Sequence, residues 1–133
     1  MMTTPSQLAG TQPFMPRPED LETFYVAFLY HGAAYVAARP DSEEHRALLQ
    51  THVAHVWNSQ HGDGPAVAGG PLFPDSVELD LPKGMSILRA ESLAEAHHLA
   101  AIDPAVVTGH FRAVVVPWLV APGRFPRERP RGK

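Results

Sequence analysis

A histidine and an aspartate are the two residues best placed to do chemistry together. His52 lies on an apolar stripe of a helix predicted within residues 39–64, and Asp103 lies one turn beyond the inner stripe of a helix predicted within 91–103. A carboxylate beside an imidazole fixes the tautomer of the ring and raises its basicity. With an ordinary pKa of about 6.5, such a histidine acts as a base or an acid at neutral pH. The stripes consist of Leu49, His52, Val53 and Val56 in the first helix and of Ala96, Leu99, Ala100 and Asp103 in the second.

The local sequence leaves a structural interpretation open for each of the two residues. A buried histidine without a partner costs about 1–3 kcal/mol, so from the pattern alone His52 is most simply a core histidine with a satisfied hydrogen bond. Asp103 precedes Pro104, which suits the first position of a helical turn, so the carboxylate is equally suited to cap that turn. The two roles are compatible, because one carboxylate oxygen can cap while the other holds the histidine.

Other candidate sites are weaker. His52 and His55 are one helical turn apart, but no cysteine and no third ligand at a telling spacing accompany them, so we expect no metal site and no cofactor. Gly69 and Gly70 before Pro71 indicate a tight turn and not a phosphate-binding loop. The remaining histidines with a clear position are predicted to be solvated or partly buried: His45, His61, His97 and His98.

Composition narrows the class of protein. The chain has 133 residues, a formal net charge of -3 and no cysteine, which fits one soluble domain that does not bind nucleic acid and carries no disulfide. It has no secretory signal pattern and no run near the roughly 20 apolar residues of a membrane span, so we expect a cytoplasmic protein with no membrane association. The segment 122–133 carries five basic residues and one acidic residue and is predicted to be a disordered, solubilising tail.

The order of predicted elements is strand, helix, strand, strand, helix, strand. The first strand, within 22–37, is apolar on both faces; Asp41 and Glu44 form a capping box for the first helix, and Ser92 and Glu95 form one for the second. Later strands are predicted over 66–73, 84–91 and 110–120, with a polar hairpin or loop over 74–84.

This order predicts an α+β, ferredoxin-like βαββαβ fold with two helices on one face of a four-stranded antiparallel sheet. The second sheet face is also apolar and needs a cover, for which a second copy of the chain is the simplest candidate. We therefore expect a homodimer with the sheets face to face. The domain is predicted over 21–121, after a flexible proline-rich arm over 1–20 and before the basic tail over 122–133.

Several segments together resemble one known family. "FYVAFLYHG" is similar to its opening strand, "THVAHV" to its first helix and "AVAGGPL" to its second strand. The most specific segment is "AESLAEAHHLAAIDPAVVTGHFRAVVVPW", with its Asp-Pro pair, the following glycine and the closing strand. Over about 22–120 the chain resembles the YCII-related (YciI-like) proteins, small dimeric α+β barrels. The glycine-rich segment 58–65 and the hairpin 73–83 depart from the family pattern and are predicted to line a pocket.

The resemblance implies that His52 and Asp103 are a catalytic His–Asp pair. It implies acid/base chemistry, such as elimination, isomerisation or hydrolysis, on a small organic substrate that is cyclic or aromatic; one family member is a dehydrochlorinase. The alternative is a module that binds a small ligand without catalysis, in which the pair is structural. Four further residues are predicted to line the substrate pocket: Tyr25, His31, Arg89 and Trp118.

Overall fold

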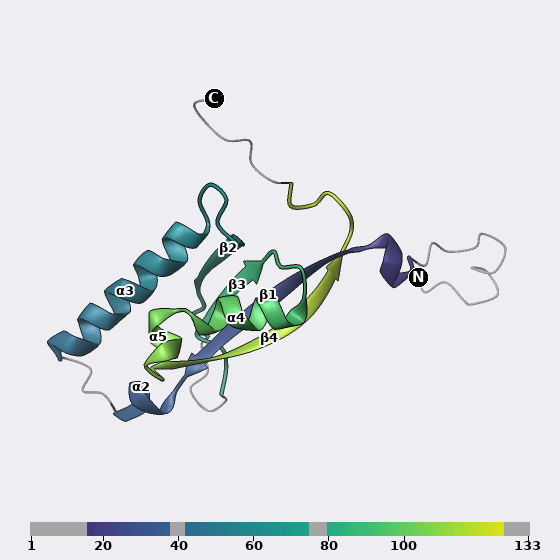
Figure 1. Cartoon of the computed structure of the whole chain (residues 1–133). Coiled ribbons are helices and arrows are strands. Elements are labelled where there is room, and N and C mark those ends of the chain that lie inside the picture. The colour runs from purple at the N-terminus through teal and green to yellow at the C-terminus, as the bar shows by residue number, and fades with distance from the viewer. Residues whose placement is uncertain (1–15, 38–41, 75–79, 127–133) are drawn as a thin grey trace, which may run out of the picture.

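The computed structural model describes residues 16–37, 42–74 and 80–126. Four strands form one sheet in the order β2-β3-β1-β4, and every neighbouring pair is antiparallel. This is the predicted ferredoxin-like α+β arrangement, with short helical segments added (Figure 1). The elements are η1 (Pro18–Asp20), β1 (Glu22–His31), α2 (Ala33–Ala37), α3 (Glu43–Ser59), β2 (Ala66–Pro71), β3 (Gly84–Leu88), α4 (Leu93–Ala101), α5 (Pro104–Val107) and β4 (Phe111–Val120).

The two long central strands are β1 and β4, which pair without interruption from Glu22 opposite Val120 to His31 opposite Phe111. The predicted first strand is too long, because the chain turns at Gly32 and continues as the short helix α2. A Cβ atom at Gly32 would lie 2.1 Å from the carbonyl oxygen of Gly109, so only glycine fits where these two segments meet. This close contact holds the start of β4, where Phe111 lies, against the end of β1.

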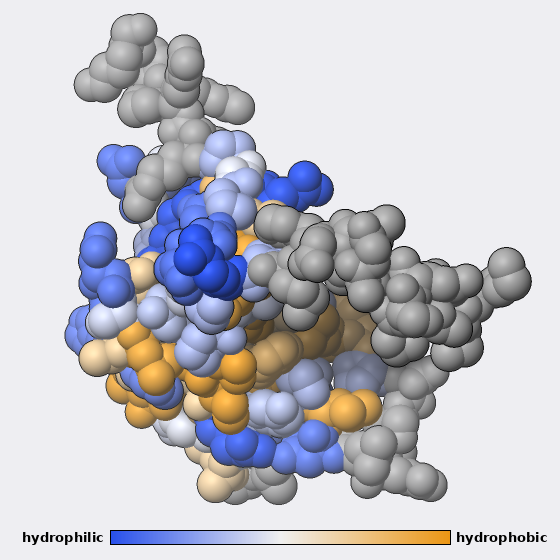
Figure 2. Space-filling model, turned by 90° about the vertical axis from the view of Figure 1, so that its right-hand side faces the viewer, coloured by the Kyte–Doolittle hydropathy of each residue, from blue (hydrophilic) through white to orange (hydrophobic). Residues whose placement is uncertain are grey.

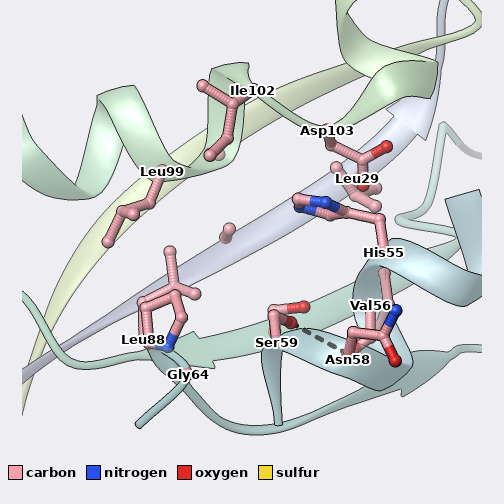
Figure 3. A pocket seen from close by; sticks show the side chains of 14 residues that line it. Leu29, His55, Val56, Asn58, Ser59, Gly64, Leu88, Leu99, Ile102 and Asp103 are labelled. Carbon is pink, nitrogen blue, oxygen red and sulfur yellow. Dashed lines mark hydrogen bonds between the residues drawn. The ribbon is translucent and has the colours of Figure 1, made fainter.

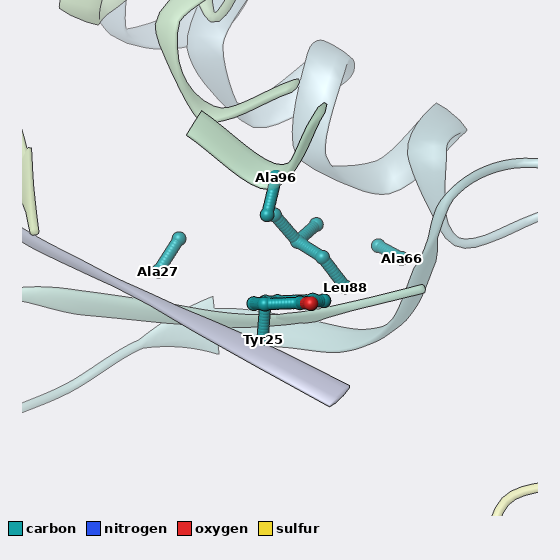
Figure 4. Packing of buried hydrophobic residues seen from close by; sticks show 5 residues of the cluster. All are labelled: Tyr25, Ala27, Ala66, Leu88 and Ala96. Atoms are coloured by element: carbon teal, nitrogen blue, oxygen red, sulfur yellow. The ribbon is translucent and has the colours of Figure 1, made fainter. Parts of the chain in front are cut away.

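All the main helices pack on one face of the sheet. Tyr25 and Ala27 of β1 lie under Ala96 of α4, which is fully buried. Figure 4 shows Ala96 above the sheet residues of this cluster. A second cluster joins Leu29 of β1 to Ala105 of α5. Small side chains on α4 and α5 let the backbone lie close to the sheet, which brings the junction of the two helices over the strands.

Helix α3 begins one residue later than predicted. Its N-cap is Ser42, whose hydroxyl accepts a hydrogen bond from the backbone N–H of His45 at 3.1 Å; Asp41 lies outside the described residues. The predicted apolar stripe is wrong at one position, since Val53 is 63% exposed. Its neighbours on the stripe, including His52, are half-buried.

The opposite face of the sheet is also apolar, as predicted. Phe24, Val26 and Ile87 are buried there, while Val116 and Trp118 on β4 are 43% and 38% exposed. Figure 2, which views the molecule from the right-hand side of Figure 1, shows apolar residues gathered in a hollow between polar ones.

The start of the predicted basic tail is ordered and covers one end of that opposite face. Phe125 packs edge-on against Phe24 with ring centroids 5.1 Å apart, and its carbonyl accepts a hydrogen bond from Arg89. The backbone N–H of Gly123 donates to Glu22 at 2.8 Å. Residues 122–126 therefore differ from the predicted disordered tail, and residues 127–133 lie outside the described part. Among the described helices, none combines the length and apolarity needed to cross a bilayer.

Candidate active site

Asp103 lies at the junction between α4 and α5. It is the N-cap of α5: its Oδ1 accepts a hydrogen bond from the backbone N–H of Ala105 at 2.8 Å, and Pro104 occupies the first helical position, as predicted. The residue is only 5% exposed. Gly109, with φ +80°, then allows the chain to leave the short helix in the left-handed conformation. The cap holds the carboxylate in one orientation against the body of the domain.

His52 meets this carboxylate from α3. Its Nδ1 lies 2.7 Å from Oδ2 and 2.9 Å from Oδ1 of Asp103. An ionised carboxylate can only accept hydrogen bonds, so Nδ1 carries the proton and donates it, and Nε2 is left as the acceptor. The side chains of His52 and Asp103 are 15% and 7% exposed, so the contact is largely shielded from water.

The ring of Phe111 packs against the ring of His52. The two ring centroids are 5.0 Å apart with an interplanar angle of 47°. Within the described residues Nε2 of His52 has no hydrogen-bond partner, and the one buried side-chain nitrogen or oxygen lacking a partner there is Nδ1 of His45. Nε2 of His52 is therefore open to the solvent side of the pair.

Two adjoining cavities flank the pair. The first, which we call the His52 pocket, has a volume of about 350 Å³. The second, the Asp103 pocket, has a volume of about 410 Å³ and is shown in Figure 3. They share Leu29, Val56 and Ser86, so they meet beneath α3. The other residues of the His52 pocket are Val53, Trp57, Gln60, Gly69, Gly70, Pro71, Lys83, Gly84, Met85 and Phe111.

The Asp103 pocket contains the second histidine of the His52-x-x-His55 pair. Figure 3 shows His55 reaching from α3 toward this cavity, with Asp103 beside it. The two histidines thus face neighbouring cavities and not one shared centre. In the part of the chain that the structure covers, no three His, Cys, Asp or Glu side chains are grouped so as to hold a metal ion.

Of the two segments predicted to line a pocket, 58–65 does so at several residues, whereas the hairpin 73–83 contributes Lys83, and its residues 75–79 lie outside the described part. Asn58, Ser59 and Gly64 line the Asp103 pocket, and Lys83 lines the His52 pocket. Sequence reasoning pointed to these segments because they depart from the family pattern, but it singled out neither Lys83 nor Ser86. Nothing in their spacing marks them, because strand pairing and the position of α3 bring them to the site.

The structure does not bring the four predicted pocket residues to the pair. Tyr25 is packed in the core under α4. Arg89 and Trp118 lie at the opposite sheet face, where Arg89 stands 5.1 Å from the ring centroid of Phe24. His31 is on the helix side, but its ring stacks on Tyr35 at 3.7 Å. Their role in substrate binding stays a prediction.

His31 belongs to a ring cluster at the start of α3. Burial lowers the pKa of His31, and the positive charges of Lys83 and His45 lower it further, while Asp80 acts in the opposite direction. His45 packs edge-on against Tyr35 with ring centroids 4.8 Å apart. His45 is only 6% exposed, so its predicted solvated or partly buried position is wrong.

Comparison with known proteins gives one family. The model of the YCII-related domain matches residues 23–119. Among curated proteins none matches the chain. The chain is similar to a solved structure of 5-chloro-2-hydroxyhydroquinone dehydrochlorinase from Burkholderia phenoliruptrix AC1100 in complex with 2,5-dihydroxybenzoquinone: the identity is 19%, the coverage is 73% of this chain and 93% of that chain, and the TM-score is 0.48.

Proposed function

The chain belongs to the YCII-related domain family, and on that premise we propose that it is an enzyme in which His52 and Asp103 form a general acid/base pair. The substrate is a small organic molecule, cyclic or aromatic, that enters the His52 pocket. A cavity of about 350 Å³ is of the size that small-molecule sites commonly have.

One observation carries the proposal: a buried carboxylate hydrogen-bonds one ring nitrogen of His52 at 2.7 Å, while the other ring nitrogen is left open beside a cavity. Nε2 removes a proton from the substrate or, in hydrolysis, from the attacking water, and Asp103 stabilises the imidazolium that forms. The imidazolium then returns the proton to a leaving group or to another atom of the substrate. Elimination, isomerisation and hydrolysis all use this sequence of proton transfers.

The test is turnover by the full chain of a panel of halogenated, hydroxylated and lactone ring compounds. We expect His52→Gln to lower kcat/KM by about 10²–10⁴-fold, since general acid/base catalysis contributes that much. His97→Gln is the matched control, since His97 is exposed on α4 and lines neither cavity. If His52→Gln folds and turns over the same compound at the wild-type rate, the pair is structural, and the non-catalytic binding module is the better account.

We propose in addition that the protein is a homodimer joined through the sheet face opposite the helices. Support comes from the exposed apolar side chains of β4 on that face, Val114, Val116 and Trp118. Sedimentation velocity measures the state directly. Val116→Glu is expected to give a folded monomer, whereas Val107→Glu, on the helix side and 71% exposed, is expected to leave the dimer intact. A wild-type protein that sediments as a monomer would contradict the proposal.

A further inference from the structure

Resting on the function proposed above, we infer that the His52 pocket takes a flat ring bearing an anionic oxygen, and that the ammonium group of Lys83 binds this oxygen. The inference adds a substrate class and a binding residue to the acid/base pair. It follows from the shape of the pocket, from the charges on its wall and from the absence of a partner for Lys83 among the described residues.

The walls of the pocket favour a flat apolar body. Trp57 and Val56 of α3 form one side, and Phe111 and Leu29 of the sheet form another. The edge of the sheet adds glycines, which present backbone without side chains. A ring can therefore lie in the pocket against aromatic and aliphatic groups, which contribute by burying its apolar surface.

Lys83 has a fixed backbone and a free charge. Its backbone N–H donates to the carbonyl of Leu29 at 2.6 Å, and its own carbonyl accepts from Leu72 at 2.9 Å. Within the described residues its ammonium group makes no ion pair or hydrogen bond. The strand pairing thus places the root of the side chain at the pocket wall. Its charge lowers the pKa of nearby His31 and is paired with no described carboxylate.

No described residue neutralises Lys83 inside the pocket. The described lining contains no aspartate or glutamate. Asp80, the acidic residue close to this end of the sheet, is held by Arg112 at 2.6 Å. A lysine beside an apolar cavity attracts an anion more strongly than one in bulk water, because the low-dielectric walls weaken screening. The pocket is therefore complementary to an anion and unfavourable to a cation.

The arrangement gives different roles to the two ionisable side chains of the pocket. His52 offers an open Nε2, which exchanges a proton with the ligand, and Lys83 offers a positive charge, which holds the ligand in place. An aromatic carboxylate and a phenolate both present a negatively charged oxygen on a flat ring, so Lys83 can bind either.

The experiment is isothermal titration of the full-length protein at pH 7.5 with three probes: benzoate, pentafluorophenolate and the neutral isostere benzamide. We expect the wild-type protein to bind at least one of the two anions about tenfold more tightly than benzamide. Lys83→Met keeps the length of the side chain and removes the charge, so it is expected to abolish the preference. Lys83→Arg is expected to keep it. Which anion binds distinguishes a carboxylate from a phenolate.

Arg124→Met is the matched control, since it removes one exposed positive charge outside the pocket. It is expected to leave the preference unchanged. Equal affinity of wild-type protein for anions and benzamide, no binding of any probe, or a preference that survives Lys83→Met would overturn the inference.

Failure of this inference is distinguishable from failure of the proposed function. If Lys83→Met keeps the preference while His52→Gln loses turnover, the acid/base pair stands without the anion site. If Lys83→Met loses the preference while His52→Gln keeps turnover, the anion site stands and the acid/base pair falls. Melting temperatures of the variants, measured alongside, confirm that each is folded.

Discussion

Two histidines on one face of α3 have opposite surroundings. His45 and His52 are seven residues apart, two helical turns, so both turn toward the domain. His45 is buried among rings, and its Nδ1 has no hydrogen-bond partner. His52 is slightly more exposed, its Nδ1 is bonded to a buried carboxylate, and its other nitrogen is open beside a cavity.

The contrast shows that burial of a histidine is not by itself a sign of function. His45 costs the fold something, since an unpartnered buried polar group is unfavourable by about 1–3 kcal/mol, and its ring packing offsets that cost. His52 gains a fixed tautomer because Asp103 is held in turn by the backbone of α5. The difference lies in Asp103, which holds one ring nitrogen of His52, and in the cavity that lies beside His52.

Changing Asp103 is expected to have the largest effect. An asparagine side chain can still accept from the N–H of Ala105 and cap α5, but it cannot hold His52 as an ionised carboxylate does. We expect Asp103→Asn to lower kcat by about 10²–10⁴-fold with a small change in stability. Asp103→Ala should lose the activity and also about 1–3 kcal/mol of unfolding free energy, measured by urea denaturation. A fully active Asp103→Asn variant would show that the carboxylate of Asp103 does not distinguish His52 from His45.

Replacing the two histidines by phenylalanine sharpens the comparison. His45→Phe keeps a ring against Tyr35 and removes the unpartnered nitrogen, so we expect unchanged activity and a free energy of unfolding that is unchanged or higher by about 1 kcal/mol. His52→Phe removes the base and is expected to be inactive. Turnover and thermal melting of both variants measure this. Loss of activity in folded His45→Phe as severe as in His52→Phe would mean that the two histidines act as one unit.

We expect a smaller effect of pH on the free energy of unfolding, through His31 in the cluster of rings that includes Tyr35 and His45. The folded-state pKa of His31 lies below its ordinary value because burial and nearby positive charges disfavour the imidazolium. Below about pH 6.5 the unfolded chain binds a proton at this residue that the folded chain binds only at lower pH. The contribution of His31 is therefore present above that pH and is lost as the pH falls through the lowered pKa.

The matching measurement is the free energy of unfolding between pH 7.5 and 5. His31→Phe keeps the stack on Tyr35 and removes the titrating group, so its stability should fall less steeply with decreasing pH than that of the wild type. Identical slopes for the two proteins would assign the pH dependence to other groups.

The sequence was most informative where one local pattern determined one local structure. The order of strands and helices along the chain, the cap by Asp103, the proline after it and the inward position of His52 all follow from periodicity and capping signals. The contact between His52 and Asp103 was predicted as sterically possible. These features depend on a few neighbouring residues, which the sequence shows directly.

The sequence was least informative where distant segments meet. The turn at Gly32 exists because Gly109 lies against it, and Val53 is exposed because α3 leaves cavities between itself and the sheet. Strand alternation grouped Tyr25 with Leu29 on one face, but only the packing of α4 decides that Tyr25 is core and not pocket. Lys83 could not be singled out, since its position depends on the pairing of β3 with β1.

The tautomer of His52 is the most direct test of the pair. Long-range ¹H–¹⁵N correlation spectra at neutral pH, assigned by comparison with His52→Gln, report which ring nitrogen carries the proton. The account predicts a protonated Nδ1 and an unprotonated Nε2 in the wild type, with this preference weakened in Asp103→Ala. A ring protonated at Nε2 alone, or a tautomer unaffected by Asp103→Ala, would contradict it.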